Sequence, residues 1–89
     1  MTEEKLQKSR ISHLVGNNLV PATGLVCRGE SAEEIRKGLI NKLEASEEKG
    51  ALMNEAVQLI GSYDWSTKQG LADFRQKYFA FETKYGIEQ

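Results

Sequence analysis

Residues 71–85 have the sequence LADFRQKYFAFETKY, which contains most of the aromatic side chains of the protein. Within this stretch, apolar residues recur at alternating intervals of three and four, at Leu71, Phe74, Tyr78, Phe81 and Tyr85. This heptad spacing places all of them on one face of an α-helix. Because aromatic side chains bury large areas, we expect this face to form the centre of the core.

Helical signals elsewhere predict an all-α fold. Residues 2–15 form one predicted helix, and Gly16-Asn17-Asn18 would end it because Gly and Asn tolerate the left-handed conformation. Ser31 and Glu34 have the spacing of a capping box and would start a second helix. The last helix would be capped by Asp64 or Ser66 and end near Gly86.

The helix that follows Ser31 either stops before Gly50 or continues through it to Ile60. Apolar residues stay in helical phase across Gly50, and an interior glycine costs only about 1 kcal/mol relative to alanine. A break at Gly50 would instead leave a separate helix over residues 51–62. Both alternatives stay open, so the sequence predicts a bundle of three or four helices.

Residues 19–29 are the β-like part of the sequence. Two short apolar segments, Leu19-Val20 and residues 25–27, flank a segment that contains Pro21 and Gly24. This arrangement predicts either a short β-hairpin or an ordered loop that closes one end of the bundle. A hairpin would have to pack on the helices, because an isolated pair of strands is only marginally stable.

Length and composition predict a single helical domain over residues 1–89. The chain is 39% hydrophobic and 28% charged, with a net charge of −1, which is typical of a globular protein. A single cysteine excludes an intramolecular disulfide, and no apolar segment is long enough for a secretory signal or a membrane span. We therefore expect a cytoplasmic protein that does not contact a membrane.

Residues that could carry catalysis or bind metal are scarce. His13 and Cys27 are the only histidine and cysteine, and neither a third orienting group nor a set of metal ligands accompanies them. Cys27 lies in an apolar segment, so we expect a buried thiol. Residues 24–29 lack the motifs of nucleotide-binding loops. We expect no enzymatic activity, no cofactor and no metal site.

The remaining signal is aromatic. Phe79 lies beside the heptad face, and it either packs on a second neighbouring helix or is an exposed anchor. Tyr63 and Trp65 stand just before the helix, and Arg75 lies within it. Because hot spots of protein interfaces favour Trp, Tyr and Arg, we predict a partner-binding site made of Tyr63, Trp65, Arg75 and Phe79.

The expected function is that of a small protein–protein interaction module, an accessory, adaptor or inhibitor of prokaryotic or phage type. It would dock a helical aromatic face on a protein partner. A homodimer is also expected, because Lys77 and Glu82 have the spacing of an interhelical ion pair in a parallel coiled coil.

The alternative function is a small DNA-binding regulator that reads DNA with its last helix. The candidate reading residues share the first half of that helix: Lys68, Gln69, Arg75 and Gln76. The aromatic surface of the helix argues against this alternative, since base-reading helices present polar side chains to the groove. We therefore do not expect nucleic acid to be the partner.

Overall fold

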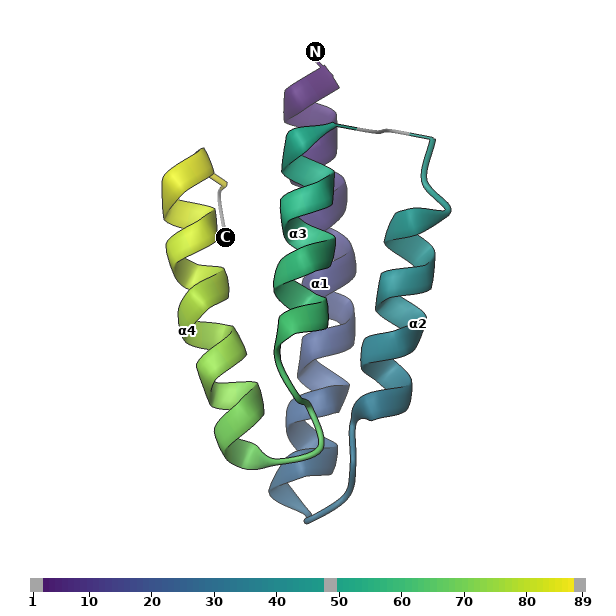
Figure 1. Cartoon of the computed structure of the whole chain (residues 1–89), viewed down its shortest axis with the longest axis vertical. Helices are drawn as coiled ribbons and strands as arrows, with labels where there is room; N and C mark the ends of the chain where they lie inside the picture. Colours follow the sequence, from purple (N-terminus) through teal and green to yellow (C-terminus); the bar gives the residue numbers. More distant parts are fainter. Residues whose placement is uncertain (1–2, 48–49, 88–89) are drawn as a thin grey trace.

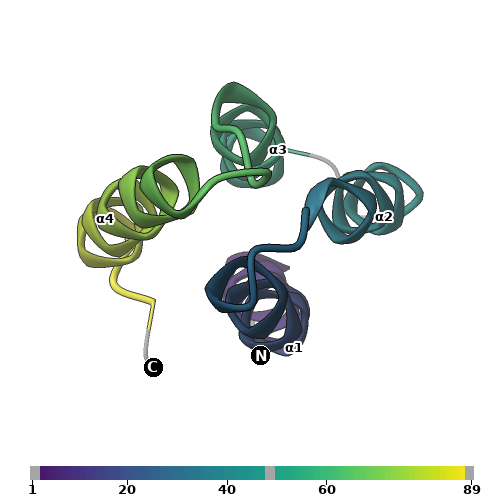
Figure 2. The same cartoon turned by 90° about the horizontal axis from the view of Figure 1, so that it is seen from below.

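The computed structural model describes residues 3–47 and 50–87, and these residues form four α-helices. The helices are α1 (Glu3–Cys27), α2 (Glu33–Glu44), α3 (Ala51–Ser62) and α4 (Lys68–Tyr85). Successive helices run in opposite directions (Figure 1). Seen along the bundle, they surround a common core in the order α1, α2, α3, α4 (Figure 2). The predicted all-α bundle is confirmed, and the described residues contain no strand.

Helix α1 extends much further than predicted, so both the end after residue 15 and the hairpin or loop at residues 19–29 are wrong. Four apolar residues of α1 are buried on one helical face: Ile11, Val15, Ala22 and Val26. Their intervals of four and seven residues continue through the segment that appeared β-like. Burial of this face outweighs the loss of one backbone hydrogen bond at Pro21, which lies inside the helix.

Gly50 separates α2 from α3, which decides between the two alternatives left open by the sequence. The apolar positions on both sides of the break are buried in the same core, as Leu43 and Met53 show. Apolar residues therefore recur at helical spacing on both sides of the break because two antiparallel helices share one core. The predicted capping box does not form, since Ser31 Oγ accepts from the backbone N–H of Glu33 at 3.3 Å.

Glu33 links the start of α2 to the connection between α3 and α4. One carboxylate oxygen accepts a 2.7 Å hydrogen bond from the backbone N–H of Trp65, and the other accepts a 2.7 Å bond from Arg36. The backbone N–H of Ala32 also donates to the carbonyl of Trp65. These bonds hold Trp65, which is 0% exposed, against Phe74 at a ring separation of 5.1 Å.

The heptad face of α4 lies in the core, as predicted. Adjacent rings along this face are 5.1 to 5.7 Å apart in a row made of Trp65, Phe74, Tyr78, Phe81 and Tyr85. Thr67, and not Asp64 or Ser66, caps the helix by accepting from the backbone N–H of Gly70 at 3.0 Å. Gly86 ends it in the left-handed conformation, with φ of 66°.

Gly70 supplies the first prediction, because it lies against the preceding loop. A Cβ at this position would be 1.9 Å from the carbonyl oxygen of Asp64, whereas a Cβ at Gly38 in α2 would meet no atom within 4 Å. We expect Gly70→Ala to lower the free energy of unfolding by about 1–3 kcal/mol through overpacking. Gly38→Ala should raise it by up to about 1 kcal/mol. Chemical denaturation followed by circular dichroism measures both, and equal effects would contradict the close approach.

The second prediction concerns Glu55 of α3, which holds the end of α4. Its carboxylate accepts a hydrogen bond from the hydroxyl of Tyr85 and lies 3.2 Å from the Lys84 ammonium. The Tyr85 hydroxyl, followed by Lys84, lowers the pKa of Glu55 below its ordinary value of 4.5. The resulting stabilisation is complete above pH 4.5 and is lost as the pH falls through the lowered pKa.

We therefore expect the melting temperature of Glu55→Gln to be below that of the wild type at neutral pH, with the difference shrinking in acid. Thermal unfolding at a series of pH values measures this difference. Glu34→Gln, which changes an exposed carboxylate of α2, serves as the control and should show no such convergence. A constant difference down to pH 3 would mean that the Glu55 charge does not stabilise the fold.

Candidate functional site: the groove between α1 and α4

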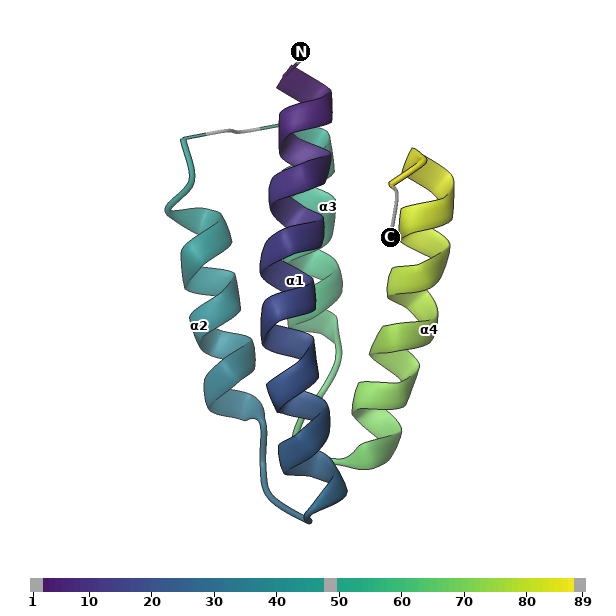
Figure 3. The same cartoon turned by 180° about the vertical axis from the view of Figure 1, so that it is seen from behind.

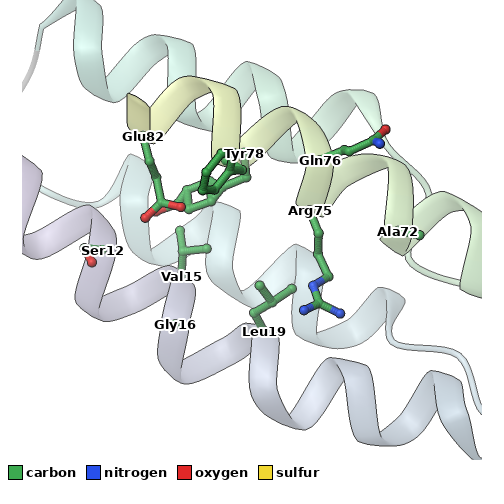
Figure 4. A pocket seen from close by; sticks show the side chains of 10 residues that line it. Ser12, Val15, Gly16, Leu19, Ala72, Arg75, Gln76, Tyr78 and Glu82 are labelled. Atoms are coloured by element: carbon green, nitrogen blue, oxygen red, sulfur yellow. The ribbon is translucent and has the colours of Figure 1, made fainter. Parts of the chain in front are cut away.

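A groove of about 650 Å³ lies between α1 and α4 (Figure 4). Figure 3 shows the face on which these two helices lie next to each other. Ten residues line the groove: Ser12, Val15, Gly16 and Leu19 from α1, and Ala72, Arg75, Gln76, Tyr78, Phe79 and Glu82 from α4. Because the helices are antiparallel, Ser12 lies near Glu82 and Leu19 lies near Arg75 (Figure 4).

The groove has an apolar base and an exposed aromatic edge. Val15 and the ring of Tyr78 are buried, and Leu19 is partly buried against the same core. Phe79 lines the groove too, but 61% of its surface is exposed. Single exposed apolar residues are common on proteins. A large aromatic side chain beside an apolar hollow is the less common combination, and it is the arrangement of an interface anchor.

Two opposite charges lie on the α4 side of the groove, seven residues apart. Arg75 extends across the groove toward Leu19, and Glu82 points toward Val15 near the opposite end (Figure 4). Arg75 is exposed, and it forms no ion pair or hydrogen bond with the described part of the chain. The site can therefore offer a partner one free guanidinium group, which favours carboxylates.

Tyr78 places a hydroxyl group below the surface of this groove. The residue is 6% exposed, and its oxygen has no hydrogen-bond partner among the residues that the structure describes. Burial, followed by the negative charge of Glu82, raises the pKa of Tyr78 well above its ordinary value. The hydroxyl therefore stays protonated at all physiological pH values.

Gly16 leaves the α1 side of the groove without a side chain at one position. It lies in the middle of a helix of 25 residues, and a Cβ added there would meet nothing within 4 Å. The fold of a single chain therefore does not require glycine at this position, although an interior helical glycine costs about 1 kcal/mol relative to alanine. The absence of a side chain leaves room for another molecule to approach the helix backbone.

The structure brings together only two of the four residues predicted to bind a partner. Arg75 and Phe79 both line the groove, whereas Tyr63 and Trp65 do not. Trp65 is fully buried, which excludes it from a surface patch. Tyr63 is partly buried against Phe74, with their rings 6.4 Å apart. For Phe79, the alternative of packing on a second neighbouring helix does not hold, because the side chain is mostly exposed.

The α1 side of the site was missed because the packing of this helix beside α4 was not foreseen, and because residues 16–29, which include Leu19, were not expected to be helical. The heptad intervals from Ile11 to Val26 were the signal that could have revealed it. The expectation for Cys27 was also wrong, since its thiol is exposed at the end of α1. His13 is exposed as well, with Nε2 3.1 Å from the side-chain nitrogen of Asn17.

The described residues form neither a metal cluster nor a membrane-spanning helix. Within residues 3–47 and 50–87, no group of three or more His, Cys, Asp or Glu side chains could hold a metal ion. None of the described helices combines the length and the apolar character needed to cross a membrane. Comparison with protein-family models, with curated proteins and with solved structures found no significant match. The geometry of the groove is therefore the basis for a functional proposal.

The buried hydroxyl of Tyr78 gives the third prediction. Removing an unpaired buried hydroxyl while keeping the ring should be neutral or should stabilise the protein, so Tyr78→Phe is expected to raise the free energy of unfolding by up to about 1 kcal/mol. Tyr85→Phe provides the matched control, and it should lower stability because the hydroxyl of Tyr85 donates to Glu55. Urea denaturation compares the two, and a clear loss of stability in Tyr78→Phe would reveal a hydrogen-bond partner for its hydroxyl.

Proposed function

We propose that this chain is a small, non-enzymatic protein–protein interaction module that docks a protein surface in the groove between α1 and α4. The exposure of Phe79 beside the apolar groove is the observation that carries the proposal. The binding residues are then Phe79 and Arg75, together with the α1 residues opposite them. This site replaces the larger patch that the sequence predicted.

The chemistry of the groove favours a protein surface as its ligand. Burial of Phe79 and of the apolar base would provide hydrophobic stabilisation, which grows with the apolar area removed from water. Arg75 adds a charged contact at one end, and arginine is enriched at interface hot spots. The groove is lined from two antiparallel helices, as suits a helix or an extended segment more than a small enclosed ligand.

The positive charge of the surface gives less support to nucleic-acid binding. Within the described part of the chain, several basic side chains form ion pairs with acidic neighbours, including Arg28 with Glu30, Arg36 with Glu33, and Lys84 with Glu55. Phosphate binding gains from clustered cations that release counterions. A protein partner therefore accounts better for the groove, and the cytoplasm is the location that we propose from composition alone.

The fourth prediction tests the groove as a protein-binding site. A photo-crosslinking amino acid placed at Gln76, an exposed residue of the groove, should join the chain to a protein after irradiation in native lysate. Phe79→Glu should abolish the crosslinked product, because a charge would replace the apolar anchor. Gel electrophoresis and mass spectrometry of the product provide the measurement.

Leu6→Glu is the matched control for this experiment. Leu6 is also a large exposed apolar residue, at 44%, but it lines a different hollow on α1, with Ser9, Arg10, His13 and Leu14. The same change there should leave crosslinking from position 76 intact. The proposal fails if no protein is crosslinked, or if both variants reduce the product equally while circular dichroism shows that both remain folded.

A further inference from the structure

We propose that the occupant of this groove is a second copy of the chain, bound so that the two α4 helices lie antiparallel across a two-fold axis. The inference rests on the proposed function, because it identifies the protein that the groove docks. The order of charges along α4 and the place of Phe79 between them support this pairing.

Arg75 and Glu82 make α4 complementary to itself in the antiparallel direction. The two residues are separated by two helical turns, about 10.5 Å along the axis, and both project toward the α1 side of α4 (Figure 4). A two-fold axis through the midpoint between Tyr78 and Phe79 places position 75 of one copy opposite position 82 of the other. In such an interface each contact occurs twice. Both arginines therefore face glutamates, and Arg75 gains the carboxylate partner that it lacks among the described residues of its own chain.

Phe79 lies at the centre of the same arrangement. It is next to the proposed axis, so the two Phe79 rings would contact each other and cover the apolar base of the adjoining grooves. Two exposed positions near this face of α4, Ala72 and Thr83, are small, whereas Gln76 is a longer side chain one turn before Phe79. Small residues on either side of a large one let two helices approach closely. The open backbone at Gly16 adds room on the α1 side.

A parallel pairing of the kind expected from Lys77 and Glu82 does not fit the structure. The parallel coiled coil would have to use the heptad face of α4, and Leu71, Phe74 and Phe81 on that face are already buried by the other helices of the same chain. A parallel pair that used the groove face of α4 instead would bring Arg75 close to the second Arg75, and like charges repel. The antiparallel arrangement uses the groove face, which lies beside the heptad face, and pairs each charge with its complement.

The fifth prediction tests the antiparallel register by exchanging the two charges. Wild-type protein should sediment as a dimer in analytical ultracentrifugation. Arg75→Glu and Glu82→Arg should each weaken self-association by at least about tenfold, because each homodimer then contains two pairs of like charges. An equimolar mixture of the two variants should form heterodimers, since every pair in them is again opposite. Lys77→Glu changes an exposed base on α4 outside the groove, and it should leave the dimer unchanged.

Recovery in the mixture separates an interface effect from a folding defect, because mixing two misfolded chains would not restore assembly. A wild-type chain that stays monomeric up to about 1 mM, or variants whose mixture is no more associated than each alone, would overturn the inference. A monomer that still crosslinks through position 76 to a different protein, dependent on Phe79, would overturn the second copy as occupant and keep the proposed function. A monomer without any crosslink would remove both.

Discussion

The row of aromatic rings from Trp65 to Tyr85 is the interaction on which the rest of the structure depends. It occupies the inner face of α4, and truncation of such a ring to alanine typically costs about 3–5 kcal/mol. Two polar attachments fix its ends, with Glu33 holding the backbone of Trp65 and Glu55 accepting the hydroxyl of Tyr85. Because this face packs in the core, the orientation of α4 about its own axis is fixed. Phe79 and Arg75 are consequently directed away from the centre of the core.

This constraint connects stability to the candidate site. Core residues and groove residues are neighbours along α4. Tyr78 belongs to both sets, and Phe79 belongs only to the groove. A substitution on the heptad face would alter the site because it would unfold α4 or change its orientation. A substitution at Phe79 or Arg75 changes the surface with little effect on the core. Binding and folding can therefore be separated by experiment even though their residues are neighbours in sequence.

The sequence predicted the parts of the fold that depend on strong periodicity. The heptad face of α4 and the all-α class followed from heptad spacing. Residues 19–27 were misassigned because Pro21 and Gly24 suggested a turn. Local preferences of this kind amount to only a few kcal/mol, and burial of the whole inner face of α1, from Ile11 to Val26, outweighs them. The heptad face of α4 can be recognised from residues 71–85 alone. The burial that decides α1 comes from segments distant in sequence.

The candidate site was predicted in half for the same physical reason. The heptad pattern places Phe79 beside the heptad face, and Arg75 lies one helical turn before Phe79. Both residues could therefore be placed from the sequence of α4 alone. Trp65 was misplaced because its depth is set by Glu33, which lies 32 residues away. The α1 side of the groove could not be predicted, since it exists only because α1 packs antiparallel to α4, and Leu19 joins it because the helix continues past Gly16. A surface formed by two helices depends on both of them, and it can be predicted only when the tertiary contacts between them are known.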